Sequence, residues 1–469
     1  MDLNANYEAY AVKKSALAEG LRASGGPVRL GKTTSNLFRA RRGAPGRSLD
    51  VRSFCNVLRV DTENATVDVE GMTPYEAVVA ETLKHGFLPA VVPELKTITV
   101  GGALTGVGIE SSSFRHGFVH ETAVEMDILL PDGRVVLCRP DNEYRDLFFG
   151  FANSYGTLGY VLRARIRLVR AKRFVELRHR TFAEEAAFLS ELQKLCAENR
   201  EPGSETQSQA KPEKWDFIEG VVFGRNHHVI TTARFTDEAP GTSDYKFMKP
   251  YYKSLSVRKT DFLTASDYVW RWDTDWFWCS RRMLMGNSFL RLLLGKWMLG
   301  SRNFWKLFNW YRKNNMEQKL ARFSASARER QKWEPVIQDV EIPVERAAEF
   351  LEFYHHTINI LPLWVCPVQA ANAEARFDLY EMKPGQLYLN FGFWDSVESK
   401  VKMPTGHYNR LLEEKVTALD GRKSLYSESF YPEQEFWRLY NGEGYRRLKT
   451  KYDPEGRLLN LYQKCVRAL

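Results

Sequence analysis

The sequence has few cysteines and spreads them widely. Its 469 residues include six cysteines, and no two of them form a C-x-x-C pair. This spacing gives no sign of a zinc site or of a disulfide framework, so no metal is expected. We therefore expect a protein that works in a reducing, cytoplasmic setting.

Long apolar runs are also missing. No uninterrupted apolar stretch reaches the ~18 residues of a membrane-spanning helix. The amino-terminal segment also lacks the basic end and apolar run of a signal peptide. We expect a chain that does not cross a membrane, although it could lie on the inner face of one as a peripheral protein.

Polar low-complexity tracts and internal repeats are absent too. Hydrophobic residues make up 44% of the chain and aromatic residues 13%, which is enough for a large core in two or three packed units. Strand-like runs alternate with turns and helical runs throughout, so the fold class is α+β. The clearest helix is Pro74–His85, which Gly86 closes. Residues 237–332 are aromatic and basic, and they favour helices with little strand.

The common nucleotide-binding motifs are missing, yet one glycine-rich segment stands out. Val100–Gly117 reads VGGALTGVGIESSSFRHG, which is neither a P-loop nor a Rossmann fingerprint. Gly101, Gly102, Gly106 and Gly108 have no Cβ atoms, which lets backbone N–H groups converge on an anion and permits positive φ where it is required. Three serine hydroxyls follow. Such a loop suits a pyrophosphate, although a glycine-rich hairpin without a ligand has the same composition.

Two weaker segments of small residues accompany it. Arg29–Arg39 (RLGKTTSNLFR) follows a short apolar strand, and Asn153–Val161 (NSYGTLGYV) precedes an arginine-rich strand. Their order along the chain, with a helix and a strand–turn–strand between them, is more specific than any one of them.

This layout resembles the FAD domain of the vanillyl-alcohol-oxidase flavoenzymes. The segments TVGGALTGVGIESSSFRHG, LLPDGRVVLC, DLFFG and GTLGYV are similar to the Δ24-sterol reductase branch, as are WDFIEGVVF, LPLWVCP and KYDPEGRL later in the chain. The resemblance implies a two-subdomain PCMH-type FAD-binding domain over residues 1–172. It further implies a cap or substrate region over 173–334, with an antiparallel sheet flanked by helices. Residues 335–469 would complete the substrate domain and pack on the FAD domain.

The resemblance also implies which residues hold the cofactor. We expect FAD to be bound without a covalent bond, with His116 as the only credible tether. The implied FAD-binding residues are Gly31, Lys32, Thr33, Thr34, Ser35, Gly101, Gly102, Thr105, Gly106, Gly108, Ile109, Glu110, Ser111, Ser112, Ser113, Gly156, Thr157 and Gly159.

The implied reaction is reduction of an isolated C=C bond in a lipid, with NADPH or NADH as the electron source. The same loop resembles bacterial 10-methylene fatty-acyl reductases, so the substrate is either a 10-methylene fatty-acyl phospholipid or a sterol-like alkene. The chain starts without the membrane anchor of the sterol enzymes, which favours the acyl substrate. A methyltransferase that supplies the methylene group would then be a partner.

Two other functions stay open. One is an FAD-dependent alcohol or sugar-lactone oxidase, and the other is a non-catalytic protein that binds membranes. Five aromatic residues lie within the nine positions Trp270–Trp278, and such aromatic density favours a lipid over a polar substrate.

The positive charge of the chain is local. Between Arg281 and Lys332 there are thirteen Lys or Arg residues and two acidic ones. Within this segment, Asn303–Lys313 has the spacing of an amphipathic helix with aromatic and basic faces. Such a helix either packs on the core with a solvated edge or lies on anionic lipid. We expect no nucleic-acid partner, because no nucleic-acid motif accompanies the charge.

The proton donor is not marked by any motif. Alkene reduction needs a hydride for one carbon and a proton for the other. No triad or paired-carboxylate spacing is visible. Glu219 and Tyr388 are the candidates, because both lie in strands of the expected substrate half.

Overall fold

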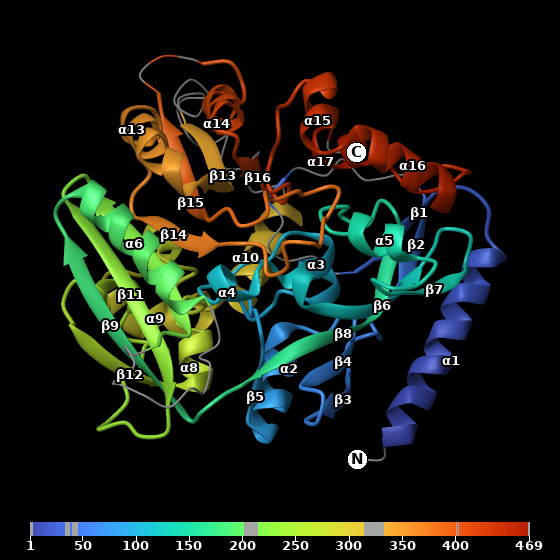
Figure 1. The fold of residues 1–469 in the computed structure, drawn as a ribbon, viewed down its shortest axis with the longest axis horizontal. Coiled ribbons are helices and arrows are strands. Elements are labelled where there is room, and N and C mark those ends of the chain that lie inside the picture. Colours follow the sequence, from blue (N-terminus) through green and yellow to red (C-terminus); the bar gives the residue numbers. More distant parts are fainter. Residues whose placement is uncertain are drawn as a thin grey trace.

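The structure is a computed structural model that describes residues 3–32, 38–39, 46–200, 214–313, 333–399, 401 and 403–467. Two antiparallel sheets dominate it, one in the amino-terminal third of the chain and one in the remainder (Figure 1). Helices cover both. The predicted α+β class is therefore confirmed.

The first sheet is built around one long strand. β8 pairs with β4 on one side and β6 on the other, and it also pairs with β5. The expected strand–turn–strand near residues 123–138 is present as β6 and β7. The strands, in sheet order, are β3 (Val57–Asp61), β4 (Thr66–Glu70), β8 (Tyr160–Arg170), β6 (Ala123–Leu129) and β7 (Val135–Cys138), with β5 (Phe87–Pro89) beside β8.

The predicted helix next to this sheet is confirmed. It consists of α2 (Tyr75–Thr82) and a 3-10 turn, η1 (Leu83–His85). Gly86 follows with φ of 75°, the left-handed conformation that glycine adopts at low cost.

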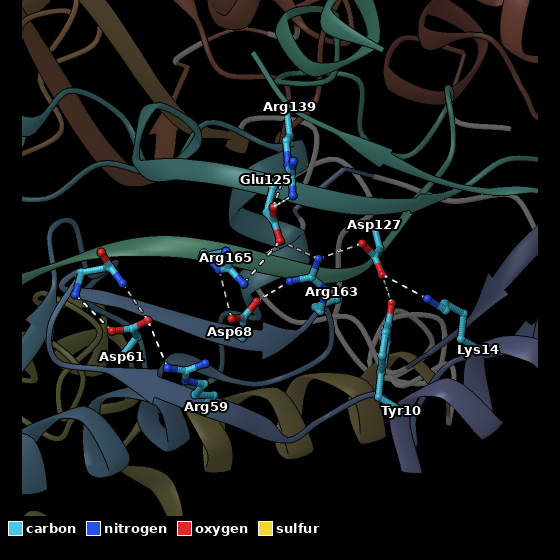
Figure 2. Close-up of polar contacts among 11 residues, drawn as sticks. Tyr10, Lys14, Arg59, Asp61, Asp68, Glu125, Asp127, Arg139, Arg163 and Arg165 are labelled. Atoms are coloured by element: carbon cyan, nitrogen blue, oxygen red, sulfur yellow. Dashed lines mark hydrogen bonds and ion pairs between the residues drawn. The ribbon is translucent and has the colours of Figure 1, made fainter. Parts of the chain in front are cut away.

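A buried ionic network fastens the amino-terminal helix α1 (Leu3–Arg22) to the sheet (Figure 2). Arg163 on β8 donates to Glu125 at 2.8 Å and to Asp127 at 2.9 Å, and it also pairs with Asp68. From α1, the Tyr10 hydroxyl donates to Asp127 at 2.6 Å. Burial raises the pKa of Asp127, but Arg163 outweighs it and holds that pKa below its ordinary value. The network therefore fixes the sheet as a rigid platform.

The second sheet has eight strands and draws on both later parts of the chain. Its strands before residue 334 pair with its later strands through β10 and β14, so residues 173–334 and 335–469 share one sheet. In sheet order they are β12 (Thr260–Thr264), β9 (Phe174–Phe182), β11 (His227–Thr236), β10 (Phe217–Gly224), β14 (Leu363–Val368), β15 (Tyr388–Glu398), β13 (Trp333–Pro343) and β16 (Arg422–Lys423).

Three helices share a hydrophobic core with this sheet. They are α6 (Glu185–Asn199), α13 (Ala347–Thr357) and α14 (His407–Ala418). The segment expected to be mostly helical contains α7 (Tyr251–Ser254), α8 (Ala265–Val269), the 3-10 turn η3 (Cys279–Met283), α9 (Ser288–Met298) and α10 (Ser301–Lys313). It also supplies the edge strand β12, whose pairing with β9 is a tertiary contact that local sequence does not encode.

The carboxyl-terminal helices return to the first half of the chain (Figure 1). Lys451 donates to Asp146 at 2.7 Å, and Arg457 donates to the Pro131 carbonyl at 2.6 Å. The elements that meet there are β1 (Val28–Gly31), β2 (Arg47–Asp50), α5 (Arg145–Gly150), α15 (Glu433–Leu439), α16 (Gly442–Tyr452) and α17 (Leu461–Cys465). Among the helices of the described residues, none is both long and apolar enough to span a bilayer.

Candidate active site

A cavity of about 1190 Å³ is lined by residues from both halves of the chain. Its wall includes the glycine segment, η3, α10 and strands β13–β15. Sites for small molecules typically measure about 300–1,000 Å³. The cavity is therefore large enough for a cofactor together with part of a second ligand.

The glycine segment forms one side of this cavity, and it begins as a short helix. α3 (Val100–Thr105) starts after Thr99, whose side chain accepts from the Gly102 N–H at 3.3 Å. The residues of the predicted loop that line the cavity are Gly101, Gly102, Thr105, Gly106, Gly108 and Ile109.

Close packing, and not positive φ, explains these glycines. None of these four glycines has positive φ, so none of them is needed here for a left-handed backbone. A Cβ on Gly101 would lie 2.7 Å from the Gly71 carbonyl oxygen, and one on Gly108 would lie 2.7 Å from Val119 Cγ2. A Cβ on Gly102 would meet only Thr99 Oγ1 within 4 Å. Gly102 is therefore the position where a side chain would enter the cavity.

The ESSS turn lies behind the cavity wall. Ser111 Oγ donates to the Glu110 carboxylate at 2.7 Å, and Ser112 Oγ donates to the Ala90 carbonyl at 2.8 Å. Ser113 Oγ accepts from the Glu110 N–H at 3.0 Å. All three serines and Glu110 are buried, and none of them lines the large cavity. These hydroxyls hold the turn in shape and do not face a ligand there.

The other two predicted segments meet the cavity in part. Lys32, Gly156 and Gly159 line it, whereas Gly31 and Thr157 do not. The glycines at 156 and 159 have φ of 73° and 145°, which favours glycine. Thr33, Thr34 and Ser35 lie outside the described residues. The proposed tether, His116, lines a separate cavity of about 190 Å³.

Two cations on the cavity wall were missed from the sequence, because no motif surrounds them. Lys464 donates to the Tyr155 carbonyl at 2.6 Å, and the Arg39 guanidinium lies 4.8 Å from the centre of the Tyr155 ring. Both line the cavity, as does Lys32. Burial, together with the positive charges of Arg39 and Lys32, lowers the pKa of Lys464 to about 7. Clustered positive charge of this kind suits an anionic ligand.

The predicted proton donor Glu219 belongs to a buried ion-pair network. Its carboxylate accepts from Arg271 at 3.0 Å, from Trp272 at 3.1 Å and from Trp364 at 2.9 Å. The same guanidinium donates to Glu110 at 3.0 Å. Glu219 lines neither cavity.

The second predicted donor, Tyr388, is also buried away from the cavity wall. It stands at the start of β15, and its hydroxyl accepts from the Lys383 N–H at 3.3 Å. The structure therefore brings neither sequence candidate to the large cavity.

Glu94 is the acidic residue that the sequence analysis missed. It lines the cavity and is 5% exposed, and among the described residues its Oε1 has no hydrogen-bond partner. Burial, followed by the negative charge of Glu110, raises its pKa well above the ordinary value, against the opposing effect of Arg271. The feature of the sequence that could have identified Glu94 is its position as an acid within the otherwise apolar run Val91–Leu95.

A second polar group lies on the wall. The Tyr426 hydroxyl donates to Asp339 at 2.7 Å and accepts from Trp394 Nε1 at 2.9 Å. Asn390 donates to the other oxygen of Asp339 at 2.8 Å. Burial raises the pKa of Asp339 to about 7. Both carboxylate oxygens of Asp339 therefore already accept hydrogen bonds within the protein.

Aromatic rings cover much of the remaining wall. Phe277 and Trp394 stack with centroids 4.3 Å apart, and Phe304 on α10 packs on Trp276 at 4.1 Å. Trp305 is buried against Phe38. The aromatic face predicted for α10 therefore turns inward, as far as its side chains are described.

Comparisons with known proteins show what the chain is similar to. The profile of a family described as an FAD binding domain matches residues 15–139. Human Δ24-sterol reductase is 27% identical over 444 residues, covering 89% of this chain and 77% of that protein. The Δ24-sterol reductase of Arabidopsis thaliana is 25% identical over 452 residues, with 89% and 76% covered. Rice cytokinin dehydrogenase 7 is 31% identical over 156 residues, covering 33% of this chain and 28% of that protein. The chain is thus an FAD-dependent oxidoreductase with a PCMH-type FAD-binding domain, homologous over most of its length to the Δ24-sterol reductases.

Proposed function

We propose that the enzyme reduces an isolated C=C bond of a lipid in the large cavity, with FAD as the bound redox cofactor. The observation that carries the proposal is the composition of the cavity wall. Cations cluster at one part of it and aromatic rings cover another. The cations suit the anionic diphosphate of FAD. The aromatic rings suit an apolar alkene.

The cations and glycines would hold the cofactor. Lys464, Arg39 and Lys32 would face the diphosphate, and backbone at Gly102 and Gly106 would approach it closely. FAD supplies two-electron hydride chemistry when bound. We propose NADPH or NADH as the electron source, because a reduced nicotinamide can transfer a hydride to the flavin.

An exposed apolar helix supports a lipid substrate. On α9, Phe289, Leu292, Leu293 and Trp297 are all exposed, and Trp297 reaches 74%. On the opposite face of α9, Arg291 is buried and donates to Asp275 at 2.6 Å. Soluble proteins rarely expose so many large apolar side chains together unless they bind something.

The exposed face of α9 follows a segment of the chain that lines the cavity. Met283 lines the cavity, and its neighbour Leu284 is 66% exposed, shortly before α9 begins. Lys296 and Lys306 are exposed nearby on α9 and α10. We propose that this face lies on anionic lipid, where each cation contributes about 1 kcal/mol, and that the substrate enters past Met283. Residues 314–332 of the basic segment lie outside the described part of the chain.

Two lipid classes remain as substrates. A sterol-like alkene is supported by the names of the similar proteins. A 10-methylene fatty-acyl phospholipid, supplied by a methyltransferase, would suit a docking surface for anionic lipid equally well. Both share the chemistry of an isolated alkene in an apolar chain.

Anaerobic spectroscopy of the purified enzyme tests the proposal. The visible flavin band should bleach with NADPH or NADH and return when a 10-methylene acyl phospholipid or a Δ24-sterol is added. Return with one lipid alone identifies the substrate class. If a nicotinamide leaves the flavin oxidised while an alcohol or a sugar lactone bleaches it, the enzyme is an oxidase and the proposal is wrong.

A further inference from the structure

We propose that Glu94 is the proton donor for the alkene, a role that rests on the reduction proposed above. The inference comes from its position on the cavity wall and from the arrangement of the charges behind it.

Glu94 is placed to act on a ligand, because it lacks an internal partner. It lines the cavity, and its Oε1 has no hydrogen-bond partner among the described residues. Three other acids line the same wall, namely Asp339, Asp395 and Glu428, and each of them interacts with another group. Asp339 accepts hydrogen bonds at both oxygens, and Asp395 pairs with Arg282. A buried polar atom without a partner is costly, so a functional site is a natural place to find one.

The groups behind Glu94 keep it neutral. Three acids, Glu94, Glu110 and Glu219, surround one guanidinium, that of Arg271. Arg271 pairs with the other two, each at 3.0 Å, and its Nη1 donates to the Tyr268 carbonyl at 2.9 Å. A third carboxylate would add an uncompensated buried charge.

One more titratable group shares this environment. The Cys366 thiol donates to the Glu110 carbonyl at 3.1 Å, and burial raises its pKa well above the ordinary value, so it stays neutral as well. Burial and the charge of Glu110 likewise raise the pKa of Glu94. The surroundings of Glu94 therefore favour its protonated form.

The step balances with the groups named. Glu94 gives its proton to one alkene carbon, while the other carbon receives a hydride from the reduced cofactor. The C=C π bond breaks and two C–H bonds form, so the alkene gains two electrons and the cofactor loses two. Glu94 is left as a carboxylate beside Glu110 and Glu219, which favours its reprotonation by water.

Single-turnover kinetics test the role, with Glu94→Gln as the variant and Glu341→Gln as the matched control. Glu341 is also a buried acid whose Oε1 has no hydrogen-bond partner among the described residues, but it lines neither cavity. We expect Glu94→Gln to keep its FAD and to be reduced by the nicotinamide as fast as the wild type. Its reoxidation by the alkene should slow by about 10²–10⁴-fold, the usual contribution of a general acid. Glu341→Gln should slow this step by less than about tenfold, and Glu94→Asp should recover part of the rate.

A second readout does not depend on turnover. The infrared difference spectrum, wild type minus Glu94→Gln, near neutral pH should contain a protonated-carboxyl band. Reoxidation of Glu94→Gln at the wild-type rate, or an unchanged carboxyl band, would overturn the role of Glu94 alone. If the reduced wild-type enzyme passes no electrons to any alkene, the proposed function fails and the donor role fails with it.

Discussion

Arg271 and Glu219 form an ion pair in the buried core behind the cavity, with Nε and Oε1 3.0 Å apart. The same arginine pairs with Glu110 at 3.0 Å, and its side chain is fully buried. Replacing Arg271 with Met would leave two buried carboxylates without their cation. We expect a loss of about 3–5 kcal/mol in the free energy of unfolding, measured by urea denaturation.

Arg134→Met is the control for this variant. Arg134 pairs with Asp132 at 2.7 Å, but both side chains are exposed. Its loss should change the free energy of unfolding by less than about 1 kcal/mol. Equal effects of the two substitutions would mean that the network of Arg271 does not stabilise the core.

Gly102→Val should give folded protein with little flavin. A Cβ at this position meets only Thr99 Oγ1 within 4 Å, so the isopropyl group would occupy the cavity and not the core. We expect the FAD content of the purified protein, read from its visible absorbance, to fall by more than about tenfold. Gly102→Ala should have a smaller effect, because its methyl group takes less of the space.

Gly224→Val is a suitable control, since a Cβ at Gly224 meets nothing within 4 Å and this residue does not line the cavity. It should keep its flavin. Full flavin content in Gly102→Val would show that FAD does not approach α3.

The sequence predicts the framework better than the chemistry. The helix Pro74–His85 and the strand–turn–strand of β6 and β7 were predictable, because each carries a local signal such as a cap or a turn. The roles of Glu94 and Lys464 could not be predicted. Their pKa shifts depend on charged residues that are distant in sequence, such as Glu110 and Arg39. Burial and charge at a cavity wall come from tertiary packing, which local patterns do not record.

The serine hydroxyls of the ESSS turn make hydrogen bonds within the protein. These hydroxyls are the most prominent feature of the glycine segment, yet they bond to Glu110 and Ala90 within the protein. A motif can thus be specific for a fold while its polar atoms serve the fold itself.

FAD affinity should depend on the protonation of Lys464. Burial and the charges of Arg39 and Lys32 lower its pKa to about 7, whereas Cys465 opposes this shift. Protonated Lys464 adds to the attraction for a diphosphate, and a bound anion raises its pKa in turn. The dissociation constant of FAD should therefore increase as pH rises above about 7, and Lys464→Met should bind FAD more weakly with a flatter pH dependence. Titration of the apoprotein with FAD measures both.

The apoprotein should show the reverse trend in stability. The pKa of Lys464 is about 7 in the folded state and about 10.5 in the unfolded state, so the unfolded chain binds more protons between these values. The free energy of unfolding should rise with pH across that window, and Lys464→Met should remove this rise. Lys194→Met, at an exposed lysine on α6, should leave both pH profiles unchanged. A pH-independent affinity in the wild type would separate Lys464 from the FAD site.

The exposed face of α9 should govern binding to anionic membranes. Leu292, Leu293 and Trp297 are 57%, 53% and 74% exposed, and replacing all three with Ser removes apolar surface without opening a core cavity. We expect co-sedimentation with phosphatidylserine vesicles to weaken by more than about tenfold, since each buried apolar side chain contributes about 1.5–3 kcal/mol. Flavin content and reduction by the nicotinamide should stay at wild-type levels.

Val12 and Val257 are 70% and 81% exposed on other elements, so the Val12→Ser/Val257→Ser variant is the matched control and should sediment like the wild type. If the triple variant also sediments like the wild type, another surface meets the lipid, and substrate entry past Met283 loses its support.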